Sequence, residues 1–244
     1  MIVMNRTPYV QADHFVSSNG TDPQNMFTDV VGTKTTRAGD LIVVLTPGFV
    51  GTIGFAGLEG TALSVVGESG TTEVFRHEQT LRDEIITDWF EYFFEPFAQI
   101  SDVFVDEIPP YSDIELTITV EGTDTACGLC AFGALHRFGS TEAGAKVEII
   151  DYSTKEVDAT TGVVTLEPGP FSRRISGSIF LNNGEINRMQ KVLANMRATA
   201  TFYSLADDAT FESVMTIFGF YRDFSIVIPY PQNSLCSIDI EGLI

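Results

Sequence analysis

Short apolar runs separated by glycine dominate the chain and limit what it can fold into. In "DLIVVLTPGFVGTIGFAGLEGTALSVVG" (residues 40–67), β-branched runs alternate with glycine-containing breaks, which is typical of short strands joined by tight turns. The clearest alternation places these apolar residues on one face of a strand: Ile114, Leu116, Ile118 and Val120. Similar runs recur towards the C-terminal end, so the sequence predicts a mainly β protein.

One helix is expected, in "GEINRMQKVLANMR" at about residues 184–197. Its apolar residues recur at helical spacing and form a single stripe: Ile186, Met189, Leu193 and Met196. Asn182 or Asn183 is placed to cap the first turn, and Arg197 suits the negative end of the helix dipole. One helix among many strands predicts a helix packed on a β-sheet.

Charge and composition divide the chain into two expected units, with a boundary near residues 122–127. Residues 1–126 carry 5 basic and 20 acidic side chains, whereas residues 127–244 carry 9 and 13. We expect residues 1–126 to form an acidic, glycine-rich all-β domain of the β-sandwich or jelly-roll type. Residues 127–244 are expected to form a β-sandwich or split barrel with the helix packed against it.

The net charge of −19 limits the expected partners, and the cysteines and N-terminal sequence indicate where the chain is made. Such a charge repels phosphate backbones and anionic lipids, so we expect neither nucleic acid nor a membrane surface as partner. No run of about 18 apolar residues is present, so no membrane span is expected. Three cysteines do not make a disulfide framework in a chain of 244 residues, and no signal peptide is evident, which indicates synthesis in a reducing cytoplasm.

The most unusual stretch is the aromatic cluster "TDWFEYFFEPF" at residues 87–97. Trp89 and Tyr92 stand beside Asp88 and Glu91, and aromatic faces with nearby carboxylates are what carbohydrate-binding surfaces use. The same rings suit a domain core or a contact with a neighbouring subunit. A core or interface role is favoured over sugar binding, and a carbohydrate-binding module is the alternative function.

Three cysteines and a histidine raise the question of a metal site. Cys127 and Cys130 form a C-x-x-C, with His136 and Cys236 further along the chain, and four such ligands suit structural zinc or an iron–sulfur cluster. A single C-x-x-C is a weak signal, and cysteine in an apolar strand behaves as a small buried hydrophobe. We therefore expect no cofactor.

Motifs of common enzymes do not stand out either. The sequence contains no G-x-S-x-G elbow, no phosphate loop with its lysine and no single carboxylate pair suited to glycoside hydrolysis. The prediction is that the protein is not an enzyme.

Three stretches of the second half are distinctive together: "VEIIDYSTKEVDATTGVVTLEPGPFSRRISGSIFL", the helix followed by "RATATFY", and "GFYRDFSIVIPYPQNSLCSIDIEGL". They resemble the C-terminal module of virion proteins from long-tailed bacteriophages. The preceding "DWFEYFFEPF…DEIPPYSDIELTITVEGT" resembles the segment that leads into that module. The resemblance covers about residues 87–243, roughly two-thirds of the chain.

This resemblance implies a structural component of the tail tip or baseplate and carries over no catalytic residue. It implies a homo-oligomer in the assembled virion, other tail proteins as partners, and a host cell-surface glycan as a further expected partner. The charged and aromatic residues expected at subunit contacts are Arg173, Arg174, Tyr221, Arg222, Asp223 and Tyr230. Because Arg222 and Asp223 are adjacent in an alternating strand, we expect them on opposite faces of the sheet.

Overall fold

The computed structural model describes residues 1–30, 32–83, 98–157, 160, 162–206, 212–227 and 232–243. Of the residues described, 58% lie in strands and 10% in helices, so the protein is mainly β, as the sequence predicts. It divides into two compact units, an N-terminal unit of Met4–His136 and a C-terminal unit of Arg137–Ile244 together with Met1–Val3. No helix among the described residues is long and apolar enough to cross a bilayer.

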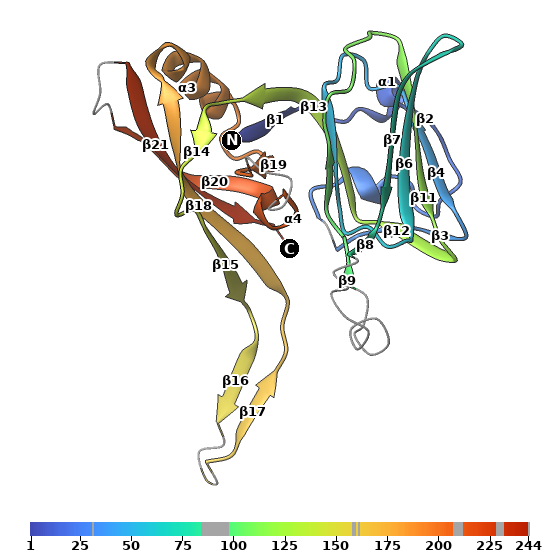
Figure 1. Cartoon of the computed structure of the whole chain (residues 1–244). Helices are drawn as coiled ribbons and strands as arrows, with labels where there is room; N and C mark the ends of the chain where they lie inside the picture. Colours follow the sequence, from blue (N-terminus) through green and yellow to red (C-terminus); the bar gives the residue numbers. More distant parts are fainter. Residues whose placement is uncertain are drawn as a thin grey trace, which may run out of the picture. The chain divides into compact units, whose positions relative to one another are not determined.

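The N-terminal unit is a sandwich of antiparallel sheets (Figure 1). A five-stranded sheet has the order β2 (Phe15–Ser18), β4 (Leu41–Leu45), β11 (Ile114–Glu121), β6 (Ala62–Ser69) and β7 (Thr72–Thr80). The facing layer contains β10 (Val103–Val105), β5 (Thr52–Ala56) and β13 (Leu129–Arg137). Two-stranded pairs join β12 (Asp124–Cys127) to β3 (Thr35–Ala38) and β8 (Arg82–Asp83) to β9 (Ala98–Gln99).

Alternating side chains from both layers fill the core of this unit. Along β11, Leu116 and Ile118 are buried while Glu115 is exposed, as the alternation predicts. Every residue of β5 is buried, and Phe55 belongs to the same cluster as Phe132 of β13. Short helical turns, α1 (Gln11–His14) and η1 (Asn25–Phe27), connect strands, and η1 adds Met26 and Phe27 to the core.

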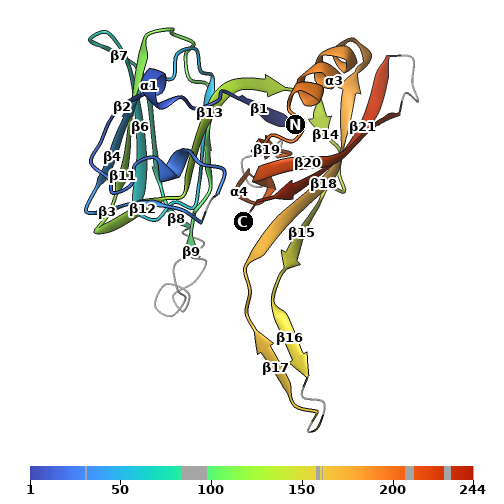
Figure 2. The ribbon, with the colours of Figure 1, turned by 180° about the vertical axis from the view of Figure 1, so that it is seen from behind.

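The C-terminal unit is built on an antiparallel sheet with one helix on it (Figure 2). Its strands follow the order β19 (Thr201–Ser204), β20 (Thr216–Val227), β21 (Asn233–Gly242) and β18 (Phe171–Asn182). β18 also pairs with β14 (Ser140–Thr141) and β15 (Lys146–Asp151), and β19 pairs with the first residues of β1 (Ile2–Arg6). The strand β21 is therefore central, with β20 on one side and β18 on the other.

The helix is the one that the sequence predicts. A turn, η2 (Asn183–Glu185), leads into α3 (Ile186–Asn195), and Asn182 Oδ1 accepts a hydrogen bond of 2.9 Å from the Gly184 N–H. Met189 and Leu193 are buried against the sheet. At the other end, Arg197 Nε donates to the carbonyl of Ala194 at 3.1 Å, which satisfies a carbonyl of the last turn. A second α-helix among the described residues of this unit, α4 (Glu212–Met215), is one turn long.

Between β15 and β18 the chain extends away from the sheet as a hairpin, continued by β16 (Thr154–Val157) and β17 (Val164–Glu167). We call residues 146–174 the arm. At its bend, Asp151 Oδ1 accepts hydrogen bonds from the N–H and the hydroxyl of Ser153, and the Gly169 N–H donates to Ser153 Oγ. These bonds tie the two strands together where Pro168 and Pro170 supply no N–H.

The division between the units falls after His136, not near residues 122–127. The residues after the expected boundary contribute to the N-terminal core, because Cys127, Cys130 and Phe132 belong to its apolar cluster. The opposite happens at the start of the chain, where Ile2 pairs with Ser204 and Val3 with Tyr203 of the C-terminal unit.

Candidate functional site

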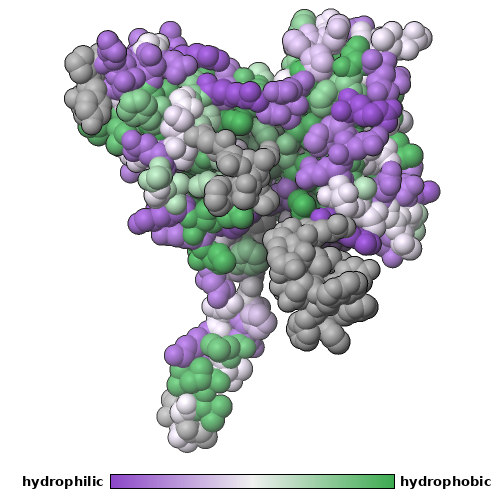
Figure 3. Space-filling model, in the orientation of Figure 1, coloured by the Kyte–Doolittle hydropathy of each residue, from purple (hydrophilic) through white to green (hydrophobic). Residues whose placement is uncertain are grey.

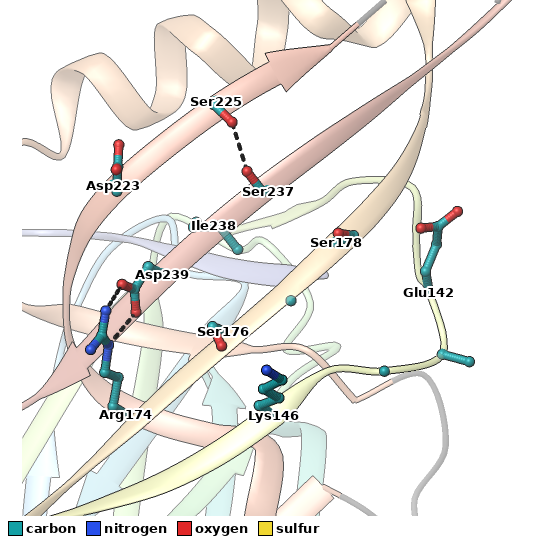
Figure 4. Close-up of a pocket in the computed structure, with 13 residues that line it drawn as sticks. Glu142, Lys146, Arg174, Ser176, Ser178, Asp223, Ser225, Ser237, Ile238 and Asp239 are labelled. Carbon is teal, nitrogen blue, oxygen red and sulfur yellow. Dashed lines mark hydrogen bonds and ion pairs between the residues drawn. The ribbon is translucent and has the colours of Figure 1, made fainter. Parts of the chain in front are cut away.

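The face of the C-terminal sheet opposite α3 carries rows of small polar side chains (Figure 4). One row crosses three strands, with Ser178 opposite Ser237 and Ser237 opposite Ser225. The Oγ atoms of Ser225 and Ser237 are 2.7 Å apart and hydrogen-bonded. The next row contains Ser176, Asp239 and Asp223 in the same order of strands.

These rows form the floor of a groove of about 480 Å³. Its wall is the segment from Glu142 through Gly144 to Lys146, which leads from β14 into β15. The described lining residues offer hydroxyl, carboxylate, ammonium and guanidinium groups but no imidazole or thiol. The hydroxyls are therefore suited to hydrogen bonding, and the lining supplies no histidine to activate one of them as a nucleophile.

Arg174 and Asp239 form the principal ion pair of this face. Arg174 Nε donates to Asp239 Oδ1 at 2.7 Å, and its NH2 group donates to Oδ2. This two-pronged contact lowers the pKa of Asp239 and raises that of Arg174, in each case mainly through the hydrogen bond. The Arg174 charge expected to meet another subunit thus has a partner within its own chain.

The prediction that Arg222 and Asp223 face opposite sides of the sheet is wrong. The pairing of β20 with β21 shifts register between Tyr221 and Asp223, so Arg222 is the extra residue of a bulge. Asp223 lies opposite Asp239, and Arg222 donates to Glu241 Oε2 at 3.0 Å. Asp239 and Glu241 are two residues apart on β21 and therefore share a face of the sheet. Arg222 and Asp223, which lie beside them, are thus on that same face.

The other residues expected at subunit contacts are dispersed. Tyr221 points to the helix side, where its hydroxyl donates to the Leu193 carbonyl at 2.9 Å. Arg173 lies opposite Ile149, on the other face of the arm from Arg174. Tyr230 lies outside the described residues.

The arm carries an exposed apolar surface that the sequence analysis did not single out. Figure 3 shows green, apolar residues along it at the bottom of the view. Nearly half of the exposed large apolar side chains that the structure describes belong to it: Val147, Ile149, Tyr152, Val157, Val163, Val164, Leu166 and Phe171. Ile149 and Leu166 are each 70% exposed, although β-branched and leucine residues in strands normally face a core.

The candidate metal ligands do not all belong to one cluster. Cys130 belongs to the core cluster of the N-terminal unit and Cys236 to that of the C-terminal unit. Burial raises the pKa of the Cys127 thiol to about 12 and that of Cys130 well above its usual value, so both are protonated near neutral pH. Cys127 Sγ donates to the Leu129 carbonyl at 3.4 Å. Within the described ranges, no group of three or more histidine, cysteine or acidic residues is arranged to hold a metal ion.

The aromatic cluster proposed for sugar binding lies outside the described residues, with Asp88, Trp89, Glu91 and Tyr92 all in residues 84–97. The groove was missed for a different reason. Its signal is present in "RISGSIFL" and "CSIDIEG", where serine and acidic residues alternate with isoleucine. The isoleucines predict the strands, whereas the serine and acidic residues between them define the exposed face.

In comparisons with known proteins, the chain matches no family model and no curated protein sequence.

Proposed function

We propose that the chain is a structural component of a bacteriophage tail, at the tip or baseplate, and that it acts by assembling with other proteins. The observation that carries the proposal is the arm, an extended hairpin whose apolar side chains lie in solvent. The arm falls within the stretch "VEIIDYSTKEVDATTGVVTLEPGPFSRRISGSIFL", which resembles tail virion proteins.

Energetics favour a partner for this surface. Fully burying a valine, leucine or phenylalanine side chain contributes about 1.5–3 kcal/mol, and a contiguous exposed apolar patch on a protein marks an interaction site. A two-stranded hairpin standing alone is also only marginally stable in water. Assembly would cover the side chains and hold the strands at the same time.

Charge supports the same mode of action. Residues 146–174 carry four basic and five acidic side chains, whereas the whole chain has a net charge of −19. The acidic remainder keeps free subunits apart and soluble, and the nearly neutral arm is where a partner meets the least repulsion. Expected partners are other tail proteins and further copies of this chain, in a virion tail assembled after synthesis in the host cytoplasm.

The test is to separate heads from tails of purified particles from the source and to digest each fraction for mass spectrometry. We expect peptides of this chain in the tail fraction, and antibody-bound gold on intact particles at the end of the tail. Heads are the matched control. Peptides absent from both fractions of clean particles would overturn the proposal.

A further inference from the structure

The outer strands of the arm have one neighbour each. Within the part of the chain that the structure describes, β16 and β17 pair only with each other, in the register Thr154–Glu167 to Val157–Val164. The outer edge of each strand therefore presents backbone N–H and C=O groups to solvent, and such an edge is a template for another strand.

The hairpin is amphipathic because opposite residues share a face. Val157 lies opposite Val164 and Lys155 opposite Leu166, so three of these four side chains make one face apolar. The other face carries the pairs Thr154–Glu167 and Glu156–Thr165. An added strand of matching pattern would extend both faces without placing a charge among the apolar side chains.

The edge of β17 is self-complementary, because two copies of it can pair antiparallel with compatible side chains opposite each other. Gly162, with φ of +71°, ends the extended backbone on one side, and Pro168 has no N–H to donate on the other. The midpoint between them is Thr165. A second copy running antiparallel about that point would place Thr165 opposite Thr165, and Val164 opposite Leu166 in both directions.

The edge of β16 does not match itself in this way. A two-fold antiparallel pair must place one residue opposite its own copy, and the two central positions of β16 are Lys155 and Glu156. Either choice sets like charges directly opposite each other, which destabilises a cross-strand pair. The same symmetry at β17 places only a threonine on the axis, and Glu167 opposite Val163.

We propose that the arm joins two copies of this chain by antiparallel pairing of β17 with β17, about a two-fold axis at Thr165. The result is a four-stranded sheet β16-β17-β17-β16 in which the apolar side chains of Val164 and Leu166 are continuous across the two central strands. This inference deepens the proposed assembly function and rests on it for the setting in which the pairing takes place. An edge this short buries far less than the roughly 800 Å² per partner of a standard interface, so the pairing between free chains is expected to be weak and transient.

Covalent trapping tests the pairing in the full-length chain. Directly opposite residues have Cβ atoms about 4.5–5.5 Å apart, close to the spacing that a disulfide needs. Thr165→Cys is therefore expected to form a disulfide-linked dimer under mild oxidation, about tenfold faster than Thr154→Cys because pairing raises the local thiol concentration. Thr154 is the matched control, an exposed threonine on the same face of the hairpin but on the other strand. The native cysteines are buried and do not compete.

Equal rates for the two variants, or no dimer from either, would overturn the β17 pairing. The particle fractionation separates this failure from that of the proposed function. Chain peptides in tails without a Thr165→Cys dimer leave the tail function standing and remove the two-fold pairing. A dimer together with absence from particles keeps the pairing and removes the tail function.

Discussion

Gly219 and Gly242 lie opposite each other where β20 meets β21. A Cβ atom on Gly219 would stand 2.0 Å from the Glu241 carbonyl oxygen, closer than any real contact. The backbone of the central strand therefore requires glycine there. Beside this close approach, Arg222 bulges out and reaches Glu241, which places a second arginine on the polar face. A single inserted residue thus adds a charge to the polar face of the sheet.

The Arg174–Asp239 pair makes stability depend on pH. The folded-state pKa of Asp239 lies below the ordinary value of 3.8, so the unfolded chain takes up a proton first as pH falls. The carboxylate's contribution to stability is complete well above pH 3.8 and is lost as pH falls through the folded-state pKa. Asp239→Asn is expected to lower the free energy of unfolding at pH 7, with the deficit shrinking as the pH falls below 3.8, as measured by urea denaturation.

Asp223→Asn is the control for this prediction. Asp223 stands opposite Asp239 on the same face, and the contact the structure shows for its carboxylate is a hydrogen bond of 2.9 Å from the Phe224 N–H. A deficit for Asp239→Asn that stays constant from pH 7 to pH 3, or one that Asp223→Asn reproduces, would contradict the role given to the ion pair.

Helix α3 was predictable because its apolar spacing and its caps depend only on residues close together in the sequence. The stripe from Ile186 to Met196, the Asn182 cap and the Arg197 contact all lie within one stretch of chain, and the structure has each of them. The arm could not be predicted in this way. "KVEIID" alternates like a half-buried strand, yet Ile149 is 70% exposed because no layer of the described structure covers it. Sequence alternation indicates which residues share a face and is silent on what that face meets.

Helix α3 is held to the sheet by a hydrogen bond as well as by its apolar stripe. The Tyr221 hydroxyl donates at 2.9 Å to the Leu193 carbonyl in the last turn, and the same oxygen accepts a hydrogen bond of 3.1 Å from the Met196 N–H. Tyr221→Phe is expected to lower the free energy of unfolding by about 0.5–1.5 kcal/mol. Hydrogen exchange should quicken in α3 more than in β11 of the other unit.

Tyr152→Phe provides the matched change on an exposed tyrosine of the arm, 45% accessible. Its free energy of unfolding is expected to stay within about 0.5 kcal/mol of the parent, as is usual for surface substitutions. If Tyr221→Phe behaves in the same way, the hydroxyl does not anchor the helix.

For the whole molecule, the sequence indicated two units but not how strands are shared between them. The shift in charge near residue 126 reflects composition, whereas the division follows pairing and burial. Val3 pairs with Tyr203, about two hundred residues away along the chain, while Thr7 donates to the Phe132 carbonyl in the N-terminal unit. No periodicity within β1 encodes such partners. A fragment starting at residue 127 would therefore lack Ile2 and Val3, which the C-terminal sheet uses.

The two units have separate apolar clusters, so we expect two unfolding transitions, each destabilised by substitutions in its own cluster. Leu116 is fully buried in the N-terminal cluster and Leu193 is 2% exposed in the C-terminal one. Each Leu→Ala change is expected to cost its own unit about 2–5 kcal/mol through lost burial and the cavity left behind. In calorimetry of the full chain, Leu116→Ala should lower the midpoint of one transition by several degrees and Leu193→Ala that of the other. Because β1 and β13 each run from one unit into the other, the opposite outcome is informative: a single transition that both substitutions shift equally would mean that these strands couple the units into one cooperative structure.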